Sequence, residues 1–246
     1  MYKGILKTIV MAGLVALTLG AVNAVAEEES PVSASGDLGV YTQYVWRGYA
    51  FSDSSLVLQP SATVAYGGFG FNLWGNLDTD YVGMDDADFN EIDMTFSYDW
   101  SYDTVSMGVG YIYYGLEGED SMELYYTIGF DTILAPSITI YRDIDAFEGW
   151  YISLGIGHSI PLTEELALDL SASIGYYDLD DVDYSELHDG TIGASVTIPV
   201  NDYFSITPSL TYTFGLSSEA KDDIEAVSAD GDSDHFFAGI TCSIAF

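Results

Sequence analysis

The feature that most constrains the fold of this chain is an alternation of apolar and polar residues with a period of two, which runs from Asp37 to Phe246. The alternation falls into twelve segments, each with an apolar or aromatic residue at every second position. Between Leu166 and Tyr176 the intervening positions hold small or acidic residues: Ala167, Asp169, Ser171, Ser173 and Gly175. Because successive side chains of a β-strand point to opposite faces, the alternation predicts strands with one apolar and one polar face.

A soluble β-sandwich gives the same alternation, and three further features favour a membrane barrel. The segments run about 9 to 12 residues, as a tilted strand needs to cross hydrocarbon, whereas soluble strands usually have about 5 to 6. Short links alternate with longer, acidic ones, as periplasmic turns alternate with outer loops in bacterial barrels. Aromatic residues mark both ends of the apolar faces. The sequence therefore predicts an all-β transmembrane antiparallel β-barrel of twelve strands, with short periplasmic turns and longer acidic extracellular loops.

The links and the aromatic residues define the two expected ends of the barrel. Short links are predicted at 67–68, 101–103, 132–135, 161–165 and 201–202, and long links at 48–55, 78–91, 115–121, 143–149, 178–190 and 215–235. Within the last link, 221–229 is predicted to be a short helix or a disordered loop. The loop-end girdle is expected to contain Trp46, Trp150, Tyr176, Tyr212 and Phe236, and the turn-end girdle Tyr66, Phe69, Trp100, Phe130, Phe204 and Phe246.

The N-terminal segment has the pattern of a secretory signal peptide. Lys3 and Lys7 precede the apolar run 8–20, and Ala24-Val25-Ala26 forms a small-residue cleavage site. We expect cleavage after Ala26, a short periplasmic linker over 27–36, and the barrel over 37–246. The protein is thus predicted to be exported through the periplasm to the outer membrane of a Gram-negative bacterium.

Charge and cysteine content exclude several other classes of protein. The chain has 39 acidic residues against five Lys and Arg, for a net charge of −34, which should repel nucleic acid. The single cysteine, Cys242, cannot form an internal disulfide. No stretch after residue 26 has the ~18 consecutive apolar residues of a membrane-spanning helix. No motif predicts a cofactor.

Two stretches carry a family resemblance. Tyr44-Val45-Trp46-Arg47-Gly48, with Ser52 and Gln59-Pro60 after it, and the later segment Phe69-Gly70-Phe71-Asn72-Leu73-Trp74-Gly75-Asn76 resemble the first three strands of the TorF family of porins. The resemblance covers about the first fifth of the chain and implies passive passage of solutes. Ile244-Ala245-Phe246 resembles the C-terminal signal of outer-membrane barrels, which implies that the barrel assembly machinery recognises Phe246.

Strand parity selects candidate pore-lining residues. Arg47 is expected to point into the lumen near the outer end of the first strand, opposite inward carboxylates. One interpretation is a charge at a pore constriction, and the other is a structural ion pair, with Gly48 permitting a sharp turn. The pore-lining candidates are Arg47, Asp93, Glu123, Asp169, Tyr41 and Trp74.

Arg142 has the opposite parity. It follows the lipid-facing Ile138 and Ile140 and is expected near the outer headgroups. There it would bind a lipopolysaccharide phosphate or extend as a snorkelling side chain with no particular partner.

The acidic loops raise the question of a metal site. Asp230-Gly231-Asp232-Ser233-Asp234 has the spacing that opens an EF-hand loop, but His235 stands where glycine is needed and Thr241 where glutamate should close the cage. Loose Ca²⁺ or Mg²⁺ binding by the acidic links is the alternative to a solvated surface. We predict no dedicated metal site.

An outer-membrane enzyme that acts on lipids is the alternative from another class of protein. His188 and His235 are expected in loops, while His158 should face lipid at the turn end. Its neighbour Ser159 points to the other face, so no nucleophile–base pair is expected and the protein is predicted not to be an enzyme.

The predicted function is a porin through which small hydrophilic solutes diffuse, with acidic walls that favour cations. The alternative is a closed structural or surface-binding barrel without a continuous pore. That alternative follows from inward aromatic residues able to fill the lumen, namely Trp74 with Tyr41, Tyr125, Tyr151, Tyr177 and Tyr203.

Overall fold

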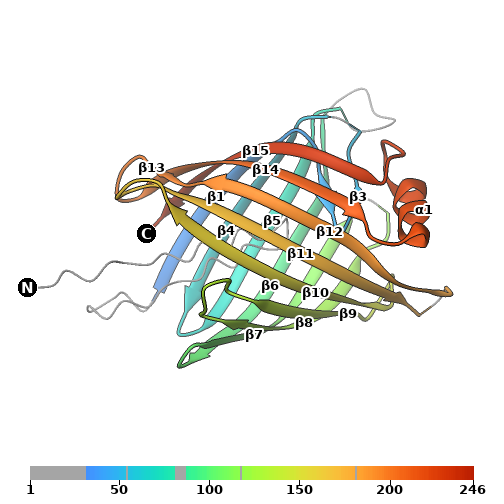
Figure 1. Ribbon diagram of the computed structural model, residues 1–246, viewed down its shortest axis with the longest axis horizontal. Coiled ribbons are helices and arrows are strands. Elements are labelled where there is room, and N and C mark those ends of the chain that lie inside the picture. The colour runs from blue at the N-terminus through green and yellow to red at the C-terminus, as the bar shows by residue number, and fades with distance from the viewer. Residues whose placement is uncertain (1–31, 54, 81–86, 117, 181) are drawn as a thin grey trace, which may run out of the picture.

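The computed structural model describes residues 32–246 except 54, 81–86, 117 and 181. The predicted signal peptide and residues 27–31 of the predicted linker lie outside the described residues. Figure 1 shows one closed barrel with helix α1 at one end, and α1 is the one helix among the described residues.

Twelve long antiparallel strands form the wall, which confirms the predicted fold class. Each strand pairs with its neighbours in the chain, and β1 pairs with both β4 and β15, so no edge is left open. Closure matters because hydrocarbon offers no partner for a backbone N–H or C=O group. The strands are β1 (Val32–Tyr41), β4 (Val57–Tyr66), β5 (Phe69–Asp78), β6 (Asp88–Tyr102), β7 (Val105–Leu116), β8 (Ser121–Phe130), β9 (Ser137–Asp143), β10 (Gly149–Pro161), β11 (Ala167–Leu179), β12 (Tyr184–Val196) continued by β13 (Ile198–Pro199), β14 (Phe204–Gly215) and β15 (Asp234–Ala245).

The alternate positions of each strand lie on the two opposite faces of the wall. Large apolar side chains such as Val64, Phe96 and Leu154 are exposed on the outer surface. Their polar neighbours along the strands, such as Asn72 and Thr95, are buried inside the barrel. An exposed apolar outer face with a polar interior is the arrangement that a lipid-embedded barrel requires.

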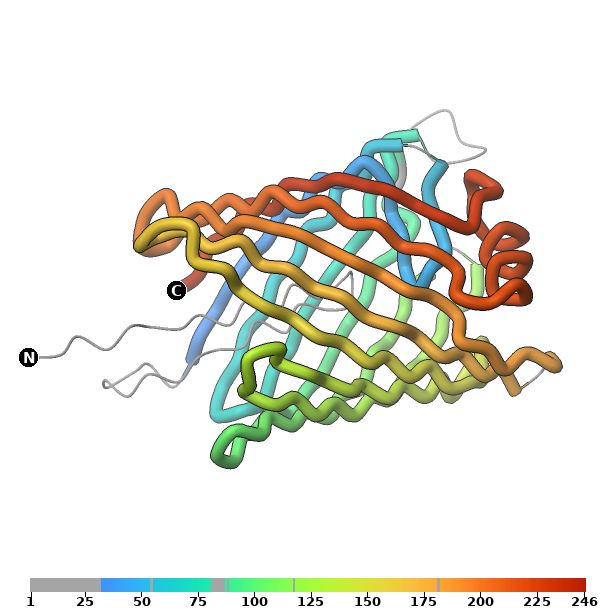
Figure 2. The backbone as a smooth tube through the Cα atoms, in the orientation of Figure 1, coloured from blue at the N-terminus to red at the C-terminus, as the bar shows by residue number. Residues whose placement is uncertain are grey.

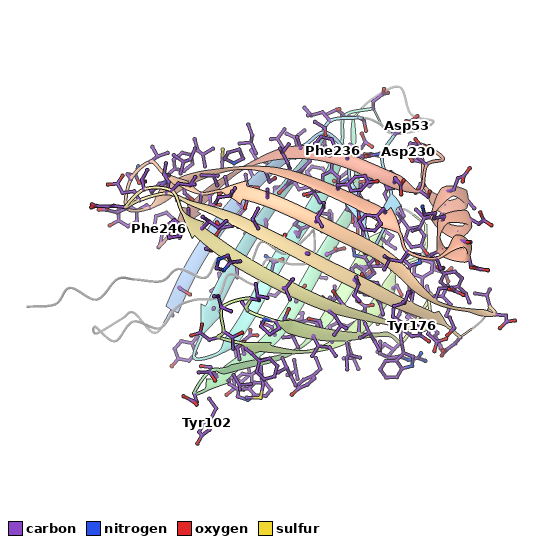
Figure 3. All side chains as sticks on the ribbon, viewed as in Figure 1. Asp53, Tyr102, Tyr176, Asp230, Phe236 and Phe246 are labelled. Carbon is purple, nitrogen blue, oxygen red and sulfur yellow. The ribbon has the colours of Figure 1, made fainter. Side chains whose placement is uncertain are left out.

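The barrel has a turn end and a loop end. At the turn end the links are short, as at Gly67–Gly68, and the last residue meets β1: Phe246 N–H donates to Ala34 O at 2.9 Å. Figures 2 and 3 show the C-terminus and Phe246 at this end, with Tyr102 projecting away from the wall. The loop end carries the longer links and helix α1 (Ser218–Val227).

The first strand differs from its predicted limits at both ends. β1 begins at Val32, before the expected start at Asp37, because 32–36 pair with 62–66 of β4. It ends at Tyr41, whereas the alternation predicted that it would continue through Arg47. The prediction for Trp46 was wrong, since this residue lies inside the barrel and not in an outer girdle.

After β1 the chain enters the lumen and forms a second, two-stranded sheet, β2 (Val45–Trp46) and β3 (Tyr49–Ala50). Arg47 and Gly48 make the turn with φ of 47° and 89°. Two successive residues with positive φ are characteristic of the type I′ turn, whose twist matches that of a hairpin. We call residues 43–52 the inner hairpin.

Helix α1 occupies about half of the longest predicted link, which runs over 215–235. Ser217 caps it by accepting a hydrogen bond from Ala220 N–H at 3.0 Å, and Ser228 follows its last turn. Its buried face carries Ala220 and Ile224. The helical alternative predicted for 221–229 is therefore the one found. Across the described part of the chain, no helix is long and apolar enough to cross a membrane.

The predicted long link over 178–190 is mostly strand, because β11 extends to Leu179 and β12 begins at Tyr184. The pairing shifts between Ile174 opposite Gly190 and Tyr176 opposite Leu187, which identifies a β-bulge in β12. The extra residue lets both His188 and Asp189 be buried. The prediction that His188 lies in a loop was therefore wrong. His235 likewise lies in β15 and is buried.

Candidate functional site in the barrel lumen

Arg47 forms the centre of the lumen site. Its Nη1 and Nη2 donate to Oε1 and Oε2 of Glu123 at 2.8 and 2.7 Å, and the two side chains are only 7% and 2% exposed. Tyr114 OH donates to the same Glu123 Oε2 at 2.8 Å. This two-pronged arrangement matches the planar guanidinium to the planar carboxylate.

Aromatic rings surround the guanidinium. Its carbon lies 4.2 Å from the centre of the Trp46 ring, 4.6 Å from that of Tyr141, 4.3 Å from that of Tyr151 and 5.9 Å from that of Tyr177. Such distances permit cation–π attraction, which is stronger in a desolvated site. The three tyrosines lie on the neighbouring strands β9, β10 and β11.

These tyrosines belong to an aromatic row that crosses five neighbouring strands. Consecutive ring centres are 5.8, 6.1, 5.5 and 5.4 Å apart. The aromatic row consists of Tyr125, Tyr141, Tyr151, Tyr177 and His188. Consecutive rings are tilted or edge-on to one another, and the row forms an aromatic wall against which the inner hairpin packs.

The backbone of the inner hairpin is held by β12. His188 Nε2 is 3.0 Å from Arg47 O, and since a carbonyl oxygen only accepts, Nε2 is the donor. Tyr184 OH is hydrogen-bonded to the other ring nitrogen of His188. Gly48 lies against the same region: a Cβ at this position would be 3.1 Å from Asp189 Cβ and 3.0 Å from Ile224 Cδ1. Only glycine fits both this space and the positive φ.

The outer side of the inner hairpin contacts α1 and the residues that follow it. Tyr49 OH donates to Asp223 at 2.7 Å, and Ala229 N–H donates to Ala50 O at 2.8 Å. Gln43 donates to Asp230 at 2.6 Å. Loops from opposite ends of the sequence thus form one unit at the loop end, where Figure 3 labels Asp230 and Figure 1 shows β3 near α1.

A second acidic group lies on β6. Tyr44 OH donates to Glu91 at 2.8 Å, and Asp93 is buried two residues along the same face. Within the described residues, Oδ1 of Asp93 has no hydrogen-bond partner. Trp74, which pairs opposite Asp93, packs against Tyr44 with ring centres 5.7 Å apart.

The six candidate pore-lining residues do not form one cluster. Arg47 and Glu123 bind each other, and Asp93 and Trp74 lie near Tyr44. Tyr41 bonds Thr241 Oγ1 at 2.9 Å, with its ring over the backbone of Gly39 and Gly239. Asp169 is buried near the turn end and accepts a hydrogen bond from Ser159.

Several site residues were missed by the sequence reasoning. Tyr44, Tyr141 and Asp189 were not selected, and His188 was assigned to a loop. The signal for His188 is in the sequence: Leu187 and Ile192 both face outward, and their odd spacing requires an inserted residue between them. Tyr44 was missed because the alternation placed it on the lipid face of a longer first strand.

Arg142 lies on the outer face of β9. Its Nη2 is 2.6 Å from Asp180 and 3.6 Å from Glu148, and its guanidinium lies 5.2 Å from the centre of the Trp150 ring. The hydrogen bond from Arg142 lowers the pKa of the Asp180 carboxyl below its ordinary value. Both ionic partners of Arg142 therefore come from this chain.

The sites considered for metal and for catalysis have other arrangements. Among the residues that the structure describes, no group of three or more His, Cys, Asp or Glu side chains is placed to hold a metal ion. Asp230 Oδ2 instead bonds both Gln43 and His235. His158 is exposed and bonds the Ile133 carbonyl, while the Ser159 hydroxyl points inward to Asp169.

The lumen is strongly acidic. Seven carboxylates are buried on strands: Asp78, Glu91, Asp93, Glu123, Asp143, Asp169 and Asp189. Among the described residues, Arg47 is the one Lys or Arg inside the barrel, since Arg142 faces outward and Lys221 is exposed on α1. The Arg47–Glu123 pair neutralises one of these acidic side chains, and the described part of the lumen holds no second Lys or Arg to pair with the others.

Comparison with known proteins gives the fold. No family model and no curated protein matches the sequence. The KdgM porin matches with a TM-score of 0.57 and 9% identity over 86% of this chain and 99% of that one. The NanC porin matches with a TM-score of 0.55 and 9% identity over 87% and 98%. The COG4313 outer membrane channel from Pseudomonas putida F1 matches with a TM-score of 0.52 and 7% identity over 89% and 97%.

At these identities the likeness extends to the fold alone. The chain is a transmembrane β-barrel of the architecture found in these porins. The resemblance to the TorF family has no matching family model and stays a prediction.

Proposed function

We propose that this protein is a porin-like channel of the bacterial outer membrane that lets small hydrophilic solutes diffuse, with a preference for cations. The observation that carries the proposal is the charge inside the barrel, where buried carboxylates outnumber the single arginine. A low-dielectric wall lined by one sign of charge concentrates ions of the opposite sign. The porin-like fold supports the same function by analogy.

The inner hairpin supports a narrow passage and a small solute. It occupies the lumen at the level of the aromatic row, held by Glu123, Glu91 and His188. A barrel of twelve strands has a modest interior, and a loop folded into it reduces the free cross-section further. Small ions and molecules are therefore the solutes that we propose.

The charge of the lumen argues against an acidic oligosaccharide as the solute of this protein. One KdgM porin structure is a complex with disordered oligogalacturonate, which is a chain of acidic sugars. In the present protein such a polyanion would face the carboxylates of β6, β8 and β9, with Arg47 already paired. We therefore propose cations or neutral molecules in place of acidic oligosaccharides.

The test is the reversal potential of the purified protein in a planar bilayer under a KCl gradient. We expect cation selectivity, reduced when Asp143→Asn and Asp169→Asn are combined. Asp222→Asn on the exposed face of α1 is the matched control and should leave the selectivity unchanged. Anion selectivity of the unaltered protein would contradict the proposal.

A closed barrel is the second candidate function, and one observation favours it. The contacts of the inner hairpin run from β6 through β8 to β12 and α1, so it reaches across the lumen. On this alternative the protein serves a structural or binding role at the cell surface. Liposome swelling with sugars of graded size separates the two: a closed barrel gives no swelling with any sugar.

Three further parts of the proposal concern export and surface partners. We propose that cleavage after Ala26 produces the mature chain, and the N-terminal sequence of the protein isolated from outer membranes should then begin at Glu27.

Deletion of Phe246 should slow assembly by the barrel machinery. A lipopolysaccharide phosphate at Arg142 would have to displace Asp180, so Asp180→Asn should strengthen lipopolysaccharide binding if that contact forms.

A further inference from the structure

The wall around Arg47 has the composition of a receptor for a guanidinium group. A buried carboxylate receives both terminal nitrogens, and rings of Tyr141 and Tyr151 lie 4.6 and 4.3 Å from the guanidinium carbon. We call Glu123, Tyr141, Tyr151 and Tyr177 the wall cage. Its members come from β8, β9, β10 and β11 and belong to the barrel itself.

The occupant of the wall cage comes from a different part of the structure. Arg47 belongs to the inner hairpin, whose two strands pair with each other and not with any wall strand. The inner hairpin can therefore leave the lumen without breaking a hydrogen bond of the barrel ladder. If it left, only Trp46 among the rings near the guanidinium would leave with it.

The wall cage would bind a cation even after the inner hairpin had left, because the negative charge of Glu123 would stay in the wall. Glu123 is 1% exposed, and its neighbour across the β8–β9 pair is the buried Asp143. Tyr114 donates one hydrogen bond to Glu123 but supplies no positive charge. Without Arg47, Glu123 and its strand partner Asp143 would lie side by side in a low-dielectric wall with no counter-charge, so a soluble cation that fits the wall cage gains both ion pairing and cation–π attraction.

The geometry selects among cations. The two short contacts run in parallel from Nη1 to Oε1 and from Nη2 to Oε2, which requires two donors fixed in one plane. A primary ammonium presents its donors from one nitrogen, and a quaternary ammonium has none. The flat tyrosine faces also match a planar cation, because guanidinium groups stack on aromatic rings.

We propose that the wall cage is a binding site for solutes that carry a guanidinium group, and that Arg47 is a tethered occupant which such a solute replaces. The inference goes deeper than the proposed function, on which it rests for the entry of solute into the lumen. Arg47 also adopts a φ of 47°, a left-handed conformation that disfavours a residue with a side chain.

Binding to the purified barrel in detergent tests the proposal independently of any conductance. Isothermal titration calorimetry with methylguanidinium should give an affinity at least about tenfold higher for Arg47→Ala than for the unaltered protein, in which the tethered arginine competes. Adding Glu123→Gln to Arg47→Ala should remove that gain. Arg142→Ala, which deletes the arginine of the outer face, is the matched control and should behave as the unaltered protein.

Two ligand controls test the selectivity. Methylammonium and tetramethylammonium should bind Arg47→Ala about tenfold or more weakly than methylguanidinium, since neither can make the paired contacts. Equal affinity of Arg47→Ala with and without Glu123→Gln would overturn the proposal, as would equal binding of tetramethylammonium.

Folding and function are followed separately. Far-ultraviolet circular dichroism and heat-modifiable electrophoretic mobility report whether each variant keeps its barrel. If Arg47→Ala fails to fold, Arg47→Lys keeps the charge without the planar fork, and methylguanidinium should then bind it more tightly than it binds the unaltered protein. A folded variant that binds but carries no current would leave the site intact and contradict only the channel proposal.

Discussion

The barrel wall and the inner hairpin are stabilised in different ways. Each wall strand pairs along its length with two neighbours, and its outer face is covered with apolar side chains. The backbone of the inner hairpin pairs only with itself. It is held in the lumen by the packing of Val45, Tyr49 and Ala50 and by polar contacts to Glu123, Glu91, His188 and Asp223. The wall should therefore tolerate most single substitutions, whereas one lost charge should move the inner hairpin.

The largest expected effect is that of Glu123→Ala. It leaves Arg47 buried without a counter-charge, which costs about 3–5 kcal/mol and disfavours the lumen position of the inner hairpin. We expect a larger single-channel conductance and new protease cleavage within residues 43–52, with the barrel retained. Glu119→Ala, at an exposed loop position, is the control. Unchanged cleavage would show that Glu123 does not hold the inner hairpin.

The wall responds to a different substitution. Leu154→Arg places a charge on the lipid face near the middle of β10 and should lower barrel stability by about 2–4 kcal/mol. Urea unfolding in lipid vesicles measures the loss. Thr139→Arg, on the polar face of β9, should cost less because that face is not in lipid. An equal cost for both would contradict the assignment of the two faces.

Gly48→Ala should give a smaller and local effect. The left-handed conformation alone costs about 1–2 kcal/mol for a residue with a side chain, and the new Cβ would also crowd Ile224 and Asp189. Gly67→Ala, with φ of 54° and nothing within 4 Å of a new Cβ, isolates the conformational cost. Hydrogen exchange of α1 amides should increase more for Gly48→Ala, and equal increases would exclude a role for the crowding.

The smallest effect concerns pH at the loop end. Because Arg142 depresses the pKa of Asp180 in the folded protein, the stability from this pair is present above the unfolded pKa and is lost as pH falls through the folded one. Carboxyl NMR should show Asp180 still ionised at the ordinary pKa of aspartate, about 3.9. Arg142→Gln should restore that ordinary value, and an unshifted titration in the unaltered protein would refute the pairing.

The regular part of the molecule was predictable because lipid imposes a simple rule. The alternation and the rhythm of the links predicted twelve strands and the outward face of residues such as Ile92 and Leu154. The predictions from the alternation were wrong where the chain leaves the lipid-facing wall and enters the lumen. Past Tyr41 the alternation continues, but Tyr44 is buried and Trp46 partly buried against polar and aromatic partners of the lumen.

The composition of the candidate site was partly predictable and its assembly was not. Parity assigned Arg47 and Glu123 to the lumen, and glycine after Arg47 indicated a sharp turn. The pairing of these two, 76 residues apart, depends on how far the inner hairpin reaches into the barrel. The β-bulge that buries His188 beside Asp189 also depends on tertiary packing, although the odd spacing from Leu187 to Ile192 records it.

The sequence by itself determined the wall, since each strand must present apolar side chains to lipid and pair on both sides, and both demands are local and periodic. Only the tertiary structure decided what fills the lumen. There the inner hairpin, the wall cage and α1 come from distant segments, and their arrangement follows from the matching of one guanidinium, one carboxylate and a few rings. No periodic pattern in the sequence predicts such a match. Each of these residues occurs once in the chain, and its spatial neighbours are determined only when the barrel closes.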